Sequence, residues 1–403
     1  MSTREAVAHQ QRTILLVALG YWSAALTNGA LRVVLPVYYA AAGVSISKIA
    51  FLFFLFKLAE IFAPLGIGLS LNRFGYKKTF LGGLAIHSAI SFLYVLPGLL
   101  AVYVERFLRG MLYMADMSAV YVKHFSSPEK RRFHINMMLG LKEASKGGGM
   151  LIGGVLIAML TLQNTLLLFA LLTTVAAAVG LFYLPDLREQ VKTPVLKIWG
   201  TVDNRIKTLG LGFGFLNGAL DAWGVVVLPV YLTTVLGASP AFVGTVMMAQ
   251  YIFHGFIVTV FSKYANASWD PRKLLILNAA MLIPVCLALS RSLTLYPFLA
   301  LVFVYMFFFS ACMVYYNHLM LEFASEEKTS IDLATYTTLT NLFKPVAVFL
   351  SGFLAQSIGF SSTYYFSIVL TILSALTCLA LPRPAEQAAE KAGAFAGGSV
   401  SIK

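Results

Sequence analysis

The chain has 403 residues, of which 59% are hydrophobic and only 12% are charged, and its mean hydropathy is +0.80. A soluble protein of this length carries about a quarter charged residues, so most of this surface must face something other than water. The net charge of +13 would suggest nucleic-acid binding in a soluble protein. Here most Lys and Arg residues lie in short loops between apolar segments, which argues against that class.

Apolar segments long enough to cross about 30 Å of hydrocarbon as helices recur along nearly the whole chain. We predict twelve such helices, at residues 13–41, 46–71, 79–98, 100–124, 134–160, 162–184, 208–236, 240–264, 273–291, 295–321, 331–357 and 361–382. The first is too long for a cleaved signal peptide and is expected to be a membrane helix. The sequence therefore predicts an all-α membrane protein.

The basic residues of the loops fall on one side of these twelve spans. They are Arg73, Lys77, Lys78, Lys130, Arg131, Arg132, the basic residues of 188–207, Lys263, Arg272, Lys273 and Lys328. The opposite side has little beyond Lys48 and Arg291. Because Lys and Arg are enriched in cytoplasmic loops, we expect both termini in the cytoplasm and the protein in the inner (plasma) membrane.

The longest polar stretch divides the chain almost in half. We predict an N-terminal six-helix bundle at 1–185, a cytoplasmic linker at 186–207 and a C-terminal six-helix bundle at 208–382. The tail at 383–403 is rich in Ala, Gly, Ser and Glu, a composition typical of disorder. We expect the protein to act as a monomer.

The two predicted bundles share a short repeat. Asn-Gly-Ala-Leu at 28–31, followed by Val-Leu-Pro-Val-Tyr at 34–38, recurs as the same two pieces at 217–220 and 227–231. Each copy lies in the first helix of its half. A parallel repeat of this kind is typical of transporters built from two pseudo-symmetric bundles.

A basic loop between the second and third spans carries a motif. It reads Gly68-Leu-Ser-Leu-Asn72-Arg73-Phe-Gly75-Tyr-Lys77-Lys78 and resembles the major facilitator signature G-x-x-x-D-R-x-G-R-[RK]-[RK], with Asn72 in the place of the acid. Gly75 permits a tight turn and Gly68 permits close helix contact. We assign a gating role to Gly68, Asn72, Arg73, Gly75, Lys77 and Lys78. The resemblance implies two bundles that rock around a site near the middle of the membrane.

Several cations cannot be assigned to the cytoplasmic loops, namely Arg32, Lys57, Arg106, Arg109, Lys142, Lys146 and Lys344. A charge at the centre of a bilayer costs about 2.5 kcal/mol or more unless it is paired or hydrated. The carboxylates at similar depth are fewer, namely Glu60, Asp116, Glu143 and Asp221, with Glu105 near a helix end. This excess of positive charge predicts a cavity for an anionic substrate.

We assign substrate binding to Arg32, Lys57, Arg109, Lys142, Lys146 and Lys344, with Asn28, Tyr21, Trp22 and Trp223 as polar and aromatic contacts. The carboxylates Glu60, Asp116, Glu143 and Asp221 are candidates for ion coupling. A glycine stripe at 147–154 is interpreted as close helix packing.

Some of these residues also have a structural interpretation. Lys57 is three residues before Glu60, a spacing that permits an ion pair within one helix. Lys142 and Lys146 are four residues apart, so their charges repel, which favours a shared anionic partner. One of the two arginines at 106 and 109 can reach the membrane interface by snorkelling, and Trp223 can be an ordinary core residue.

Enzymatic motifs are missing from the sequence. It has no H-E-x-x-H, no G-x-S-x-G and no nucleotide-binding glycine loop, so we expect neither catalysis nor a cofactor. The three cysteines are isolated from one another, and the six histidines show no metal-ligand spacing. Without a motif for ATP hydrolysis, uphill transport must use an ion gradient.

Within the major facilitators, three sets of residues resemble the organoarsenical efflux permeases of the ArsJ type. They are Tyr21-Trp22 with Asn28-Gly-Ala-Leu-Arg32, Lys142 with Lys146-Gly-x-Gly149 and Gly153-Gly154, and Asp221-x-Trp223 ahead of Leu228-Pro-Val-Tyr231. The resemblance implies export of 1-arseno-3-phosphoglycerate, an anionic ester made by glyceraldehyde-3-phosphate dehydrogenase. It also implies arsenic resistance and a functional link to that enzyme. Asn28 stands where that family has an acid.

The expected function is export of a small anionic metabolite, such as this organoarsenical, by proton antiport. The cationic residues suit a doubly anionic cargo, since Arg can bind oxyanions with two parallel hydrogen bonds. Two alternatives remain open. One is a major facilitator with another cargo, such as an organophosphate, a carboxylate or a drug, and the other is a membrane sensor that does not transport.

Overall fold

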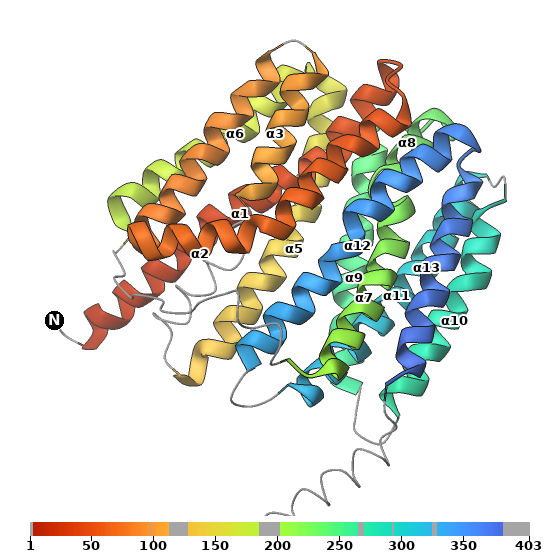
Figure 1. Cartoon of the computed structure of the whole chain (residues 1–403). Coiled ribbons are helices and arrows are strands. Elements are labelled where there is room, and N and C mark those ends of the chain that lie inside the picture. The colour runs from red at the N-terminus through yellow and green to blue at the C-terminus, as the bar shows by residue number, and fades with distance from the viewer. Residues whose placement is uncertain are drawn as a thin grey trace, which may run out of the picture.

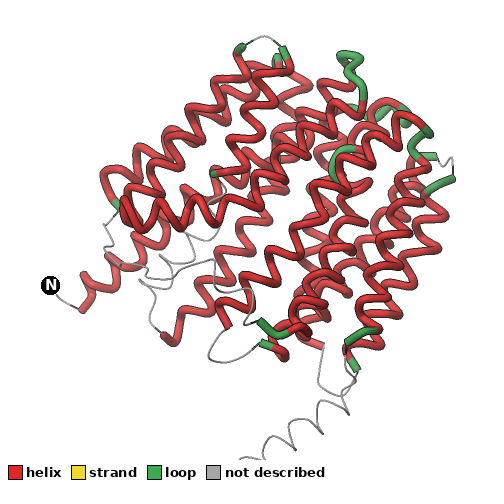
Figure 2. The backbone as a smooth tube through the Cα atoms, viewed as in Figure 1, coloured by secondary structure: helices red, strands yellow, loops and turns green. Residues whose placement is uncertain are grey.

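The computed structural model describes residues 3–96, 98–112, 128–184, 202–264, 270–291, 294–324 and 329–381. Within these ranges all regular secondary structure is helical, and the long helices lie side by side in Figures 1 and 2. Residues 186–201 of the predicted linker at 186–207, and the predicted tail at 383–403, fall outside the described residues.

The first half of the chain forms helices that differ in detail from the predicted spans. They are α1 (Thr3–Ala41), α2 (Ile46–Ser91), the 3-10 helix η1 (Phe92–Val95), α3 (Leu99–Met111), α5 (Pro128–Met159) and α6 (Leu162–Tyr183). The second predicted span and most of the third, which continues into η1, lie in α2, and α2 breaks at Gly75 with φ 76° and ψ 175°. Residues that carry a side chain rarely adopt this φ, so glycine at position 75 permits the backbone to turn there without a longer loop.

The second half contains α7 (Asn204–Gly224), α8 (Val227–Thr234), α9 (Pro240–Tyr264), α10 (Pro271–Leu289), α11 (Leu295–Phe323), α12 (Thr329–Ser357) and α13 (Ser361–Leu379). The seventh predicted span is interrupted between α7 and α8, at Val225 and Val226. Pro229 has no N–H to donate to the carbonyl of Val225, which weakens the helix at this point. The related proline of the first repeat, Pro36, lies inside the continuous helix α1.

Helix contacts separate into two groups. Helices α1, α2, α3, α5 and α6 pack mainly with one another, and so do α7 and α10 to α13, while α9 contacts α11 of this second group and α5 of the first. The two groups meet chiefly where α5 contacts α9 and where α2 contacts α12. In Figure 1 the first group is red to yellow and the second is green to blue.

Small residues permit this contact between the groups at one end of the molecule. The Cα atom of Gly244 on α9 lies 3.1 Å from the position that a Cβ atom on Gly154 of α5 would occupy. A Cβ atom on Gly352 of α12 would lie 2.2 Å from the Cβ atom of Ala50 on α2. Close backbone approach of this kind is a usual means of packing membrane helices.

The outer surface of the helices is strongly apolar. Exposed side chains include Phe182, Tyr296 and Leu100, and eight helices in the described ranges are long and apolar enough to cross a membrane. Water-soluble proteins rarely leave such large apolar surfaces uncovered. With α2 counted as two spans and α7 with α8 as one, the fold is that of an all-α membrane protein with 12 helices, as predicted.

Candidate functional site

A small polar cavity of about 20 Å³ lies among the helices of the first group, where they face the break between α7 and α8. Its lining residues are Asn28, Arg32, Phe53, Phe56, Lys57, Glu60, Arg106, Lys146 and Val225. This lining contains four cationic side chains and one carboxylate. Three of the cations belong to the predicted binding residues, and Arg106 is the fourth.

The helical repeat explains why one face of α2 supplies four of these residues. Phe53, Phe56, Lys57 and Glu60 follow the spacing i, i+3, i+4 and i+7, so they share one side of the helix. Lys57 is 7% exposed, and its Nζ lies 3.2 Å from Oε2 of Glu60. The ion pair that the sequence spacing permits is therefore present.

Close packing between α1 and α5 brings Arg32 and Lys146 to the same cavity. A Cβ atom on Gly29 would lie 2.0 Å from the carbonyl oxygen of Lys146, and one on Gly149 would lie 2.0 Å from that of Leu26. Residues larger than glycine would force the two helices apart. The glycine stripe of α5 thus packs helices closely, as the sequence indicated.

One carboxylate is shared by the two lysines of α5. Oε1 of Glu143 lies 2.8 Å from Nζ of Lys142 and 3.2 Å from Nζ of Lys146. The shared anionic partner expected from the lysine spacing therefore includes a residue of the protein itself. One negative charge between two positive charges leaves this part of α5 positive.

Arg32 makes a contact that crosses between the two helix groups. Its Nη1 donates a hydrogen bond of 2.5 Å to the hydroxyl oxygen of Tyr251 on α9. Its guanidinium carbon also lies 5.9 Å from the centre of the Tyr251 ring. Within the described residues, no carboxylate accepts a hydrogen bond from Arg32, although Asp221 and Glu60 are near enough to interact with its charge.

Two charged residues of the second group face the same region. Lys344 on α12 interacts with the charges of Lys57, Asp221 and Glu60. Asp221 on α7 is 9% exposed, and its Oδ2 has no hydrogen-bond partner in the described part of the chain. Oδ1 of Asn28 is buried and also lacks a partner there. These atoms are available for a ligand or a proton.

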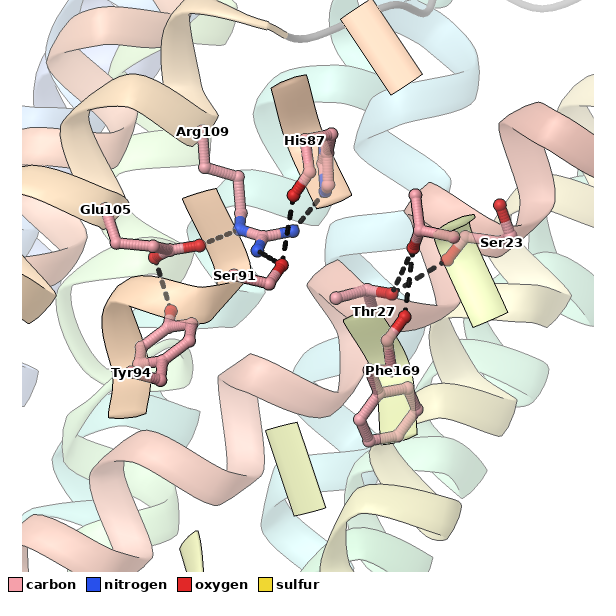
Figure 3. A network of polar contacts seen from close by, with 9 residues as sticks. Ser23, Thr27, His87, Ser91, Tyr94, Glu105, Arg109 and Phe169 are labelled. Carbon is pink, nitrogen blue, oxygen red and sulfur yellow. Dashed lines mark hydrogen bonds and ion pairs between the residues drawn. The ribbon is translucent and has the colours of Figure 1, made fainter. Parts of the chain in front are cut away.

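Arg109 lies in a separate buried cluster, shown in Figure 3. Its guanidinium donates to the Glu105 carboxylate and to Oγ of Ser91, and it contacts the ring nitrogen Nε2 of His87. Tyr94 donates from its hydroxyl to the other oxygen of Glu105. Arg109 is 1% exposed and is not among the lining residues, so these contacts indicate that it holds α3 against α2.

Arg106, one turn before Arg109, faces the cavity instead. It is 2% exposed, and its Nε and Nη1 atoms have no hydrogen-bond partner among the described residues. Its guanidinium carbon lies 4.3 Å from the ring centre of Phe56 and 5.0 Å from that of Phe53. These aromatic rings stabilise the cation while leaving donors free.

The aromatic residues assigned to the site from sequence lie outside this lining. Tyr21 belongs to a buried cluster with side chains of α2, and Trp22 packs against the same cluster. Trp223 is fully buried in the second group, where its ring centre lies 4.9 Å from that of Tyr305. This packing matches the alternative interpretation of Trp223 as a core residue.

The gating loop is described in part. Arg73 is exposed and its guanidinium carbon lies 5.4 Å from the ring centre of Phe74, while Lys77 and Lys78 follow the break at Gly75. The side chains at Gly68 and Asn72, and the coupling candidate Asp116, lie outside the described residues.

Sequence reasoning missed two contributors to the site. Tyr251 is one of 19 tyrosines and stands in an ordinary apolar helix, so nothing in the sequence distinguishes it. Arg106 was recognised as a buried cation, but the choice between it and Arg109 depends on the direction of each side chain around α3. The described residues contain no group of three or more His, Cys, Asp or Glu side chains that could hold a metal ion.

Solved structures similar to this chain are membrane transporters. A bacterial homolog of the human lysosomal transporter Spinster, inward-facing and occupied, matches with a TM-score of 0.81 at 10% identity, over 93% of this chain and 97% of that chain. The nucleoside transporter NupG matches at 0.73 and 12% identity, over 92% and 98%. A bacterial homologue of the iron transporter ferroportin, inward-facing, matches at 0.71 and 15% identity, over 92% and 98%. At these low sequence identities, the structural similarity shows a shared fold and nothing about the substrate.

No curated protein sequence matches the chain significantly. The sequence profile of the Major Facilitator Superfamily matches residues 17–202 and 210–402, which together span most of the chain. Transporters of this family carry small substrates across a lipid bilayer and are not enzymes. The chain therefore belongs to the Major Facilitator Superfamily and is a secondary transporter.

Proposed function

We propose that this transporter exports a small metabolite with more than one negative charge, which binds in the cavity lined by Arg32, Lys57, Arg106 and Lys146. The observation that carries the proposal is the charge of the lining, which contains four cations and one carboxylate. Buried cations without equal compensation are costly in a membrane protein. Their retention is explained when an anionic cargo supplies the missing charge.

The residues of the cavity suit different parts of such a cargo. Guanidinium groups bind oxyanions through several directed N–H donors, whereas an ammonium group acts as a compact point charge. Arg32 and Arg106 would bind the oxygens of anionic groups, and Lys57 and Lys146 would add charge nearby. Lys344, from the second helix group, would approach the same cargo from the opposite wall.

The proposed cargo is 1-arseno-3-phosphoglycerate, with an arsenate group at one end and a phosphate at the other. The resemblance of the motifs at Tyr21–Arg32, Lys142–Gly154 and Asp221–Tyr231 to organoarsenical permeases supports this choice. Pentavalent arsenic in an ester does not require thiolate ligands. Accordingly, the free cysteines Cys286, Cys312 and Cys378 are individually buried and take no part in the cavity.

Transport is proposed to use proton antiport and alternating access. The bundles at 1–185 and 208–382 would rock around the cavity. The protein would act as a monomer in the inner membrane, with both termini in the cytoplasm. Glu60, Glu143 and Asp221 are the described carboxylates close enough to the cations to exchange protons as the cargo binds and leaves. Glyceraldehyde-3-phosphate dehydrogenase would supply the cargo.

The cargo is tested in arsenic-sensitive cells that express this protein with or without glyceraldehyde-3-phosphate dehydrogenase. Co-expression should increase resistance to arsenate and lower cellular arsenic, with no gain against arsenite. Resistance to neither oxyanion, with retained transport of 3-phosphoglycerate in vesicles, would reassign the cargo to an organophosphate. Failure to transport any organic anion would reject the proposal.

A further inference from the structure

The hydrogen bond between Arg32 and Tyr251 joins the two helix groups at the cavity. Arg32 lines the cavity from α1, and its Nη1 donates to the Tyr251 hydroxyl oxygen over 2.5 Å. Tyr251 lies on α9, which packs against α5 through Gly154 and Gly244. The bond is therefore placed beside a principal junction between the groups.

The Tyr251 hydroxyl is a weak partner for a buried guanidinium. It is neutral, whereas hydrogen bonds between a cation and an anionic oxygen are shorter and about twice as strong. In the described part of the chain it is also the one group that accepts a hydrogen bond from Arg32. An anionic oxygen that enters the cavity would thus be the better acceptor for Nη1.

We propose that Tyr251 competes with the cargo for Arg32 and so sets the affinity of the cavity for anions. This inference rests on the proposed function, because it requires an anion at Arg32. When the cargo binds, Arg32 exchanges the hydroxyl for an anionic oxygen, and the contact between α1 and α9 is lost. Occupancy of the cavity is thereby communicated to the junction between the groups.

Tyr251 packs against α5 less closely than Gly244 does. Gly147 of α5 lies opposite, and a Cβ atom there would be 3.5 Å from both Cβ of Tyr251 and Cγ of Met248, an ordinary contact distance. The tight interlock of Gly154 with Gly244 lies about two turns away along α9. A cargo that binds the released state better than the joined state shifts the population toward release.

The first experiment measures binding of 3-phosphoglycerate, a phosphate and carboxylate probe, to the purified full-length protein by calorimetry. Tyr251→Phe keeps the ring and removes the competing oxygen, so the probe should bind about threefold to tenfold more tightly. Tyr251→Leu should act in the same direction. The matched control Tyr364→Phe removes a buried hydroxyl that lacks a partner among the described residues, and should leave the affinity unchanged.

The second experiment reports the junction without requiring cargo. Ser47 on α2 donates to Oε1 of Gln356 on α12, so a short bis-thiosulfonate reagent should link cysteines at these positions through disulfides when the groups are joined. In the protein without a substitution at Tyr251, addition of 3-phosphoglycerate should lower the disulfide yield. In Tyr251→Phe the yield should already be low without probe, and in Tyr364→Phe it should match the parent.

Weaker or unchanged binding in Tyr251→Phe would overturn the competition, since Tyr251 would then be a cargo ligand or a bystander. An unchanged disulfide yield in this variant would overturn the link to the junction. If the parent does not bind the probe but Tyr251→Phe still lowers the yield, the junction role is supported and the proposed cargo class is wrong. The two proposals therefore fail by different measurements.

Discussion

Glu105 and Arg106 are neighbours in the chain, yet no hydrogen bond or ion pair joins their side chains in the described structure. Both oxygens of the Glu105 carboxylate are occupied, one by Arg109 and the other by the Tyr94 hydroxyl. Nε and Nη1 of Arg106, which lines the cavity, have no hydrogen-bond partner among the described residues. The buried cluster thus takes up the hydrogen bonds of the Glu105 carboxylate, although its charge is near enough to interact with Arg106.

Neutralising the two arginines of α3 should have opposite effects. Arg106→Gln removes a charge that forms no ion pair within the described part of the chain, so the free energy of unfolding should hold or rise while transport is lost. Arg109→Gln leaves the Glu105 carboxylate buried without its cation, which should cost about 3–5 kcal/mol of stability. Thermal unfolding of the purified variants, with uptake of probe anion into inverted vesicles, separates the two outcomes.

The pair of variants is matched, because both residues are buried and lie three positions apart on one helix. Early melting of Arg106→Gln with normal transport would show that Arg106 holds the helices together and that the anion binds elsewhere.

The cations of α1 and α5 should be needed for transport and dispensable for stability. Lys146→Gln leaves Glu143 paired with Lys142, so we expect loss of transport with little change in melting temperature. Arg32→Lys should also impair transport by about tenfold or more, because an ammonium group cannot reproduce the directed donors of a guanidinium. Uptake and thermal unfolding are measured on the same preparations.

A structural role for these cations predicts the reverse pattern. If Arg32→Gln and Lys146→Gln transport at the parental rate but melt early, the binding site assigned here is wrong. Lys273→Gln, at an exposed position near the start of α10, serves as a control for the loss of one positive charge outside the cavity lining.

Local features of the sequence predicted the helices and their charges well, because long apolar runs and isolated buried cations are visible without a structure. The pairing of Lys57 with Glu60 and that of Lys146 with Glu143 also follow from helical spacing. The glycine stripe indicated where α1 and α5 would touch. These predictions needed only the geometry of one helix or one helix face.

Features that depend on how distant helices meet were not predictable. Whether Arg106 or Arg109 faces the cavity depends on the rotation of α3 against α2, and Tyr251 meets Arg32 across 219 positions of sequence. Trp223 was assigned to the site as an aromatic contact, yet the rotation of α7 places it among Tyr305 and Tyr364. The break at Val225 was missed because both flanking segments are equally apolar.

The orientation of the chain in the membrane is a separate prediction. A reporter fused after Arg205, or at the C-terminus, should score as cytoplasmic, and one inserted at Ser45 should score as periplasmic or extracellular. The reason is the concentration of basic residues in the loops on the side of Arg205. A non-cytoplasmic score for the fusion at Arg205 would overturn the proposed arrangement of the two bundles.

The junction between the groups should be sensitive to single methyl groups on α9. A Cβ atom on Gly244 would lie 2.5 Å from the carbonyl oxygen of Met150, a contact that real Cβ atoms do not make. Gly244→Ala should therefore push α9 from α5, lower the melting temperature and decrease disulfide cross-linking of cysteines at Ser47 and Gln356 by the same reagent. Gly255→Ala is the matched control on the same helix, because a Cβ atom there meets nothing within 4 Å.

The control should even gain stability, since alanine is favoured over glycine inside a helix by up to about 1 kcal/mol. Both variants add one methyl group to α9, so a general effect of helix propensity would change their melting temperatures in the same direction. Only a steric requirement at the junction would lower the melting temperature of Gly244→Ala while that of Gly255→Ala stays the same or rises. Equal melting temperatures and equal disulfide yields for the two variants would mean that α5 and α9 can separate at this point without cost. The close contact of the glycines would then not be what joins the groups.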